Sequence, residues 1–231
     1  MATSINGWTV ITDPASSDLA SEWIPRTTIK IKGHKHVLPL FLALAAEYGH
    51  TVAPLRKNEC GMWNPRKARM ANAWSDHASG TAIDLNWNHE GAMGKNGGMK
   101  SMSSQQVSAC RALAKKYHLL WGGDYHNPTA WDPMHFAVKP GYGPMAMGLV
   151  TKSLFIQPDG TTRPSLNNIM DSSLVTTIAQ KGLNKKFNCG LVVDGIVGPK
   201  TSAAILMAEK RLKLAPTGKI SIDLLVKLGA I

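Results

Sequence analysis

Apolar residues recur at helical spacing in several stretches of the chain. Between residues 37 and 48 they occupy positions 37, 38, 41, 42, 44 and 45, which places them along one side of a helix. A glycine at position 49 marks the C-terminal end of this helix. The same spacing predicts four more helices, over residues 103–117, 174–187, 203–214 and 222–228.

Shorter runs rich in β-branched residues are typical of strands. They predict strands over 7–11, 28–31, 81–87 and 135–138. Side chains alternate along a strand, so Ala82 and Asp84 share one face of the third run while Ile83 and Leu85 take the other. Asp84 can therefore face a site while its neighbours pack in the core.

Two breaks in this pattern indicate the domain organisation. Proline and glycine interrupt regular structure over 139–144, and residues 149–170 are rich in Ser, Thr, Asn and Pro, as linkers often are. We therefore predict a first domain over 1–148, a linker over 149–170 and a second domain over 171–231.

Two segments about fifty residues apart carry the candidate chemistry, 74–86 and 131–136. A catalytic zinc site needs three nitrogen or oxygen ligands, an open fourth position and a nearby general base. His77, Asp84 and His135 can be the ligands, and Asp132 can be the base. The competing role for Asp132 is that of a further carboxylate ligand.

These segments read Ser-x-His-x-x-Gly-x-Ala-x-Asp and, downstream, Asp-x-x-His. The pattern resembles the zinc peptidases of the D-Ala-D-Ala carboxypeptidase / L-Ala-D-Glu endopeptidase family, which includes phage endolysins. The match rests on seven positions: Ser75, His77, Gly80, Ala82, Asp84, Asp132 and His135.

The resemblance implies a Zn²⁺-dependent peptidase that hydrolyses stem peptides of bacterial peptidoglycan at L-Ala-D-Glu type bonds. A D-Ala-D-Ala carboxypeptidase is the nearest alternative, and a wall-binding protein without catalysis is another. The family also uses an arginine ahead of the first motif to contact substrate. By position, Arg69 is the first candidate for that role and Arg66 the second.

The C-terminal part carries a second resemblance. Asp-Gly-x-x-Gly-x-x-Thr at residues 194–201 lies between two predicted helices, as in the three-helix peptidoglycan-binding domains of wall hydrolases. Glycine permits the turn and proline suits the first helical position, so these residues can also be purely structural. The expected fold is α+β: a small antiparallel sheet with flanking helices carries the zinc site, and a small three-helix domain follows.

A net charge of +11 favours polyanionic partners, among them nucleic acid, anionic membranes and acidic wall polymers. The charge is dispersed, and plain solubility explains it equally well. We expect a monomer that binds peptidoglycan, binds no nucleic acid and does not insert into membranes. No secretory leader is recognisable, so we expect synthesis in a host cytoplasm and action on the cell wall after release.

Two other sets of residues invite a metal-binding interpretation. His34 and His36 can bind a metal or be exposed loop histidines. Cys60, Cys110 and Cys189 form no Cys-x-x-Cys pair, which argues against a thiolate zinc site and favours three reduced thiols.

Overall fold

A computed structural model of the chain describes residues 1–68, 71–87, 102–126, 131–154, 156, 159–161 and 172–231. Contacts divide the chain into two compact units, one of Met1–Gly141 with Phe155–Arg163, the other of Tyr142–Leu154 with Pro164–Ile231. The second unit takes in helix α3 (Pro144–Ser153), a stretch that the sequence analysis divided between the first domain and the linker.

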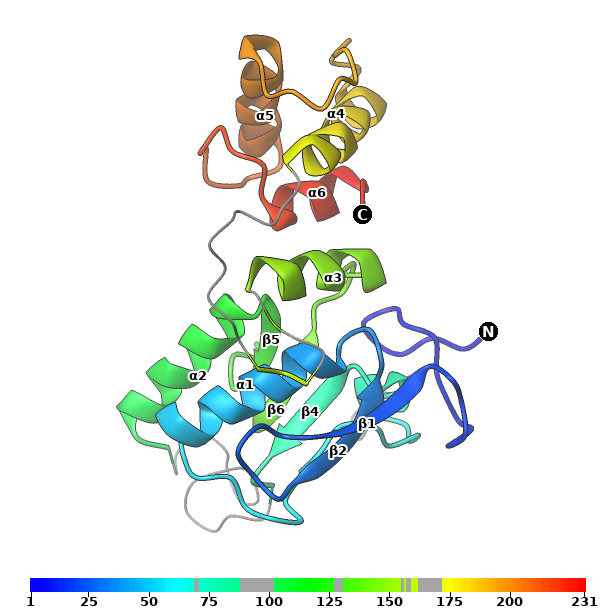
Figure 1. The fold of residues 1–231 in the computed structure, drawn as a ribbon, viewed down its shortest axis with the longest axis vertical. Helices are drawn as coiled ribbons and strands as arrows, with labels where there is room; N and C mark the ends of the chain where they lie inside the picture. Colours follow the sequence, from blue (N-terminus) through cyan, green and yellow to red (C-terminus); the bar gives the residue numbers. More distant parts are fainter. Residues whose placement is uncertain (69–70, 88–101, 127–130, 155, 157–158, 162–171) are drawn as a thin grey trace. The chain divides into compact units, whose positions relative to one another are not determined.

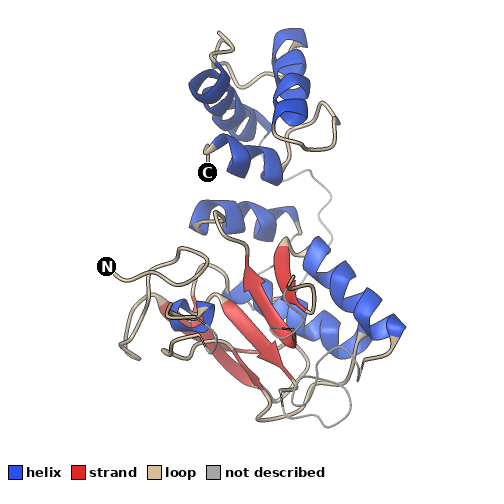
Figure 2. Ribbon diagram, turned by 180° about the vertical axis from the view of Figure 1, so that it is seen from behind, coloured by secondary structure: helices blue, strands red, loops and turns tan. Residues whose placement is uncertain are grey.

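The first unit is built on a four-stranded antiparallel sheet (Figure 2). Its strand order is β3 (Cys60–Gly61), β4 (Ala82–Leu85), β6 (Asp132–Val138) and β5 (Leu119–Gly122). The two central strands, β4 and β6, carry Asp84, Asp132 and His135 of the predicted site. The described part of the chain has six α-helices beside its antiparallel strands, which confirms the mixed α and β character expected from the sequence.

Helices α1 (Leu38–Thr51) and α2 (Ser104–Lys116) confirm two of the predicted helices. Eight of the fourteen residues of α1 are buried, and the helix lies beside the sheet of the first unit (Figure 1). The ring of its Tyr48 meets Phe136 of β6 edge to face at 6.3 Å. α2 begins with a capping box in which the Ser103 hydroxyl and the Gln106 side chain satisfy backbone N–H groups reciprocally.

The N-terminal strands lie elsewhere than predicted. Residues 7–11 form no strand, and Thr9 contributes only an isolated bridge to Thr3. The hairpin instead consists of β1 (Leu19–Trp23), which was not among the predicted strands, and β2 (Lys30–His34), close to the predicted 28–31. No residue of β1 is fully buried, so a hydrophobic pattern does not mark this strand in the sequence.

His34 is buried, which contradicts its interpretation as an exposed loop histidine. Its ring packs edge-on against Trp8 with 4.7 Å between centroids. Burial, followed by the charge of His36, lowers its pKa to about 4, so the imidazole is neutral near pH 7.

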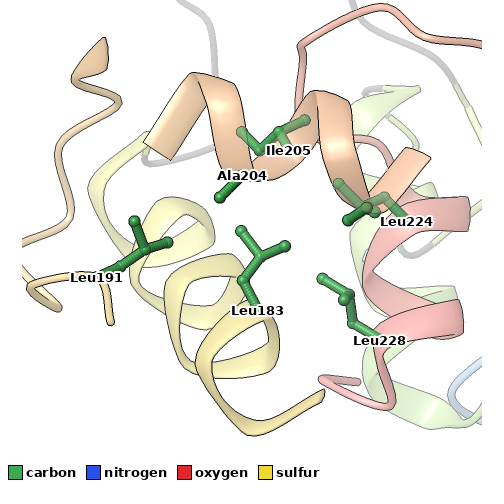
Figure 3. Packing of buried hydrophobic residues seen from close by; sticks show 7 residues of the cluster. Leu183, Leu191, Ala204, Ile205, Leu224 and Leu228 are labelled. Atoms are coloured by element: carbon green, nitrogen blue, oxygen red, sulfur yellow. The ribbon is translucent and has the colours of Figure 1, made fainter. Parts of the chain in front are cut away.

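The helices of the second unit enclose a core of their own. α4 (Ser172–Phe187), α5 (Pro199–Arg211) and α6 (Ile222–Leu228) follow the predicted helices closely. Figure 3 shows how their apolar side chains converge. The core consists of Leu183, Leu191, Ala204, Ile205, Ala208, Leu224 and Leu228.

The buried side-chain amide of Gln180 forms hydrogen bonds with the Asp-Gly turn that precedes α5. Gln180 donates through Nε2 to Asp194 Oδ1 at 2.8 Å and to the Ile196 carbonyl at 3.1 Å. Its Oε1 accepts the Gly195 N–H at 3.0 Å. Gly195 has φ +74, and Pro199 begins α5. These contacts give the motif a structural role.

Of the helices within the described ranges, none combines the length and apolar character that a membrane span requires. Cys60, Cys110 and Cys189 are all free thiols.

Candidate metal centre

His77 is presented by a short 3-10 helix, η1 (Asp76–Ser79). The helix is capped at its start by the Ser75 hydroxyl, which accepts the His77 N–H at 3.3 Å. It ends at Gly80, which has φ +66 and whose N–H bonds the carbonyls of Asp76 and His77. The imidazole donates its Nδ1–H to the Met62 carbonyl at 2.6 Å, an assignment that follows from the acceptor opposite it. This bond fixes the tautomer and turns a bare Nε2 toward the sheet.

Asp84 and His135 lie directly opposite each other on the central strands. They are register partners in the antiparallel pair β4–β6, so their side chains project from the same face of the sheet. Asp84 Oδ1 lies 2.8 Å from His135 Nδ1 and 3.2 Å from His77 Nε2. The two imidazole nitrogens are 3.2 Å apart.

These three atoms fit a bound cation. His77 Nε2 is an acceptor because its Nδ1–H is committed to Met62, and it faces a carboxylate oxygen and a second imidazole nitrogen. Electron-pair donors this close repel one another unless positive charge lies between them. Two imidazoles and a carboxylate are a common ligand set of catalytic zinc, which keeps its fourth position open. Among the residues described, this is the group of three donors that could hold a metal ion.

The pKa shifts of Asp84 and His135 also indicate that the cluster favours positive charge beside the carboxylate. Burial acts to raise the pKa of Asp84, but the close imidazoles of His135 and His77 outweigh it and hold that pKa far below its usual value. Burial acts to lower the pKa of His135, yet the hydrogen bond and charge of Asp84, with smaller effects of Asp132 and Asp76, raise it. The site therefore favours a carboxylate with a cation or proton beside it.

Asp132 reaches the neighbourhood of the cluster through a β-bulge. Trp121 pairs with Phe136, but the next residue, Gly122, pairs with Asp132, so residues 133–135 form the bulge. The Trp121 indole secures it by donating Nε1–H to the Pro133 carbonyl at 2.8 Å. Bulges re-aim side chains beside active sites. Asp132 was expected one turn before the strand, whereas the structure makes it the first residue of β6.

The glycine at the bulge is required by close backbone approach. A Cβ at Gly122 would lie 2.2 Å from the Asp132 carbonyl oxygen. The next glycine, Gly123, leaves room for the Trp121 ring in the same way. The Trp-Gly-Gly run of the sequence therefore shapes the bulge that carries Asp132.

The two candidate arginines differ in what the structure shows. Arg69 lies outside the described residues. Residues 88–100, which hold four glycines and are expected from the sequence to form a loop beside the site, lie outside them as well. Arg66 is partly buried, and its Nη1 donates to the neighbouring Lys67 carbonyl at 3.3 Å. The role of either arginine stays a prediction.

Sequence reasoning missed a buried polar network that ties the N-terminal segment to the His77 loop. Asn6 is at its centre: its Nδ2 donates to Thr81 Oγ1 at 2.8 Å and to the Val138 carbonyl at 3.3 Å, and its Oδ1 accepts the Ser4 hydroxyl. Its backbone N–H donates to Asp76 Oδ1 at 2.8 Å. Asn6 and Asp76 are 70 positions apart in the chain, and no pattern in the sequence predicts their contact.

Replacing Asn6 with alanine is expected to lower the free energy of unfolding of the first unit by about 1–3 kcal/mol, because buried partners of the amide are left unsatisfied. Denaturant unfolding of the full chain measures the change. Asn64→Ala, at an exposed asparagine, is the control and is expected to be neutral. Equal stability of the two variants would contradict the structural role of Asn6.

One family model matches the segment that contains the metal cluster. Residues 68–138 match the family model described as D-alanyl-D-alanine carboxypeptidase. The matched segment contains His77, Asp84, Asp132 and His135. Searches of curated proteins and of solved structures each found no match. The family match supports an enzyme, a zinc-type metallopeptidase that acts on peptidoglycan peptides.

Proposed function

We propose that the protein is a phage-type endolysin that hydrolyses L-Ala-D-Glu type bonds in peptidoglycan stem peptides. The observation that carries the proposal is the convergence of His77 Nε2, Asp84 Oδ1 and His135 Nδ1 within one buried cluster. The family match over these residues supports peptidase chemistry on this substrate class. Because that family model is described as a carboxypeptidase, removal of a terminal D-Ala is the second candidate.

In this proposal His77, Asp84 and His135 hold the zinc ion. When bound, zinc supplies a Lewis acid that polarises the scissile carbonyl and makes water more acidic. Asp132 accepts a proton from the attacking water and passes it to the leaving amine. The Met62 carbonyl keeps His77 in the tautomer that binds metal, and Arg69 or Arg66 contacts the substrate.

The second unit is proposed to bind the wall as a peptidoglycan-binding domain. Its compact helical core and its Asp-Gly turn before α5 support this assignment. The basic residues of 151–231, which give this stretch a net charge of +6, complement the acidic groups of bacterial walls.

Digestion of purified peptidoglycan with zinc present, followed by mass spectrometry of the new termini, tests the proposal. The wild type is expected to release D-glutamyl or D-isoglutaminyl N-termini. His77→Ala is expected to lower the rate by roughly 10³-fold or more, because the zinc that activates water is lost. His50→Ala, at an exposed histidine in the last turn of α1, is the matched control.

The other outcomes are equally distinct. Release of D-Ala alone would make the protein a carboxypeptidase. An absence of new termini in every digest would leave a wall-binding protein and would reject the catalytic role.

A further inference from the structure

Tyr125 follows β5 in a turn that leads back toward β6. The turn is fixed by the backbone: Asp124 N–H donates to the Trp121 carbonyl at 3.1 Å, and Tyr125 N–H donates to the Gly122 carbonyl at 3.4 Å. The Trp131 indole donates to the Tyr125 carbonyl at 3.0 Å and ties the turn to the residue before Asp132. Tyr125 is thus anchored to the same bulge that carries Asp132.

The Tyr125 ring lies beside the His135 ring of the metal cluster. Its centroid lies 6.4 Å from that of the His135 ring, at an interplanar angle of 51°. The Tyr125 side chain is partly buried beside this imidazole. A phenol O–H is a hydrogen-bond donor, so the side chain can offer one to a molecule bound at the cluster.

Amide hydrolysis calls for such a group. As water adds to the carbonyl, negative charge develops on the oxygen, and a preorganised donor stabilises it. Beside the candidate arginines, the Tyr125 hydroxyl is a further donor near the cluster.

We propose that Tyr125 is a catalytic residue whose hydroxyl donates a hydrogen bond to the carbonyl oxygen of the scissile amide. This inference rests on the proposed peptidase function. Tyr125 keeps its proton throughout, while Asp132 carries the proton that moves from water to the leaving amine. The hydroxyl stabilises the negative charge that develops on the carbonyl oxygen.

Tyr125→Phe tests the proposal in the full chain with zinc and a synthetic L-Ala-D-Glu stem peptide. The variant is expected to lower kcat by about 10²-fold with KM changed less than about threefold, because the lost bond forms in the transition state. Zinc affinity, measured by competition with a chelating dye, is expected to stay unchanged. A phosphinate analogue of the peptide is expected to bind more weakly by the same factor as the loss in kcat/KM.

Tyr117→Phe is the matched control. It removes a tyrosine hydroxyl bonded to Glu47 at 2.7 Å, between α1 and α2, and is expected to leave kcat unchanged. Wild-type turnover by Tyr125→Phe would overturn the inference and leave the proposed function standing. Loss of zinc binding would also overturn it, since Tyr125 would then act by positioning His135. An inactive wild type would reject the proposed function and this inference together.

Discussion

Replacing Gly80 with alanine is expected to lower the free energy of unfolding of the first unit by about 3 kcal/mol or more. Gly80 has φ +66, where a side chain is strained. Its Cβ would lie 2.6 Å from the His34 backbone nitrogen. The backbone cannot move aside easily, because that same His34 N–H donates to the Gly80 carbonyl at 2.9 Å. Denaturant unfolding monitored by circular dichroism measures the loss.

Gly7→Ala separates the two causes of this strain. Gly7 belongs to the same unit and has φ +91, but a Cβ there meets nothing within 4 Å. It is expected to cost only the dihedral strain, about 1–2 kcal/mol. If both variants lose the same stability, the close approach of Gly80 to His34 contributes nothing, and our explanation of this glycine is wrong.

Replacing Asp132 with asparagine is expected to lower kcat by about 10²–10⁴-fold, because the amide has nearly the same shape but cannot accept the proton of the attacking water. Zinc binding is expected to persist, since the three converging donors are His77, Asp84 and His135. Hydrolysis of the stem peptide and zinc titration by calorimetry measure the two properties separately.

Asp18→Asn is the control for this substitution. Asp18 is exposed and pairs with Lys35 at 2.9 Å, and the variant is expected to keep full activity. If Asp132→Asn loses zinc together with activity, Asp132 is a metal ligand rather than the base. Full activity with zinc bound would remove Asp132 from the chemistry altogether.

The helices could be predicted from the sequence because apolar spacing and capping residues act over short stretches of the chain. The apolar spacing of 37–48 and the Ser103 cap predict α1 and α2, and Pro199 marks the start of α5. Each of these features acts within one or two turns of the chain. Where a stretch lacked such spacing, as at α3, the sequence indicated the end of the first domain and the start of a linker, whereas the tertiary structure shows a helix.

The residues of the metal cluster could be predicted from the sequence for a different reason. Its chemistry needs particular side chains, so His77, Asp84 and His135 could be named before any geometry was known. Strand alternation also indicated that Asp84 projects away from Ile83 and Leu85. The sequence could not give the register that sets Asp84 opposite His135, because cross-strand pairing joins residues far apart in the chain.

The sequence by itself determined the chemical identity of the site and the helices around it. Only the tertiary structure decided how that site is supported: the Asn6 network beneath His77, the bulge that carries Asp132, and the turn that brings Tyr125 to the cluster. Each of these contacts joins segments that are far apart in the chain, and no repeating pattern in the sequence links such segments. The contacts depend on hydrogen-bond geometry and not on residue type alone. A sequence pattern therefore specifies which groups react, while backbone pairing over long separations specifies where they meet.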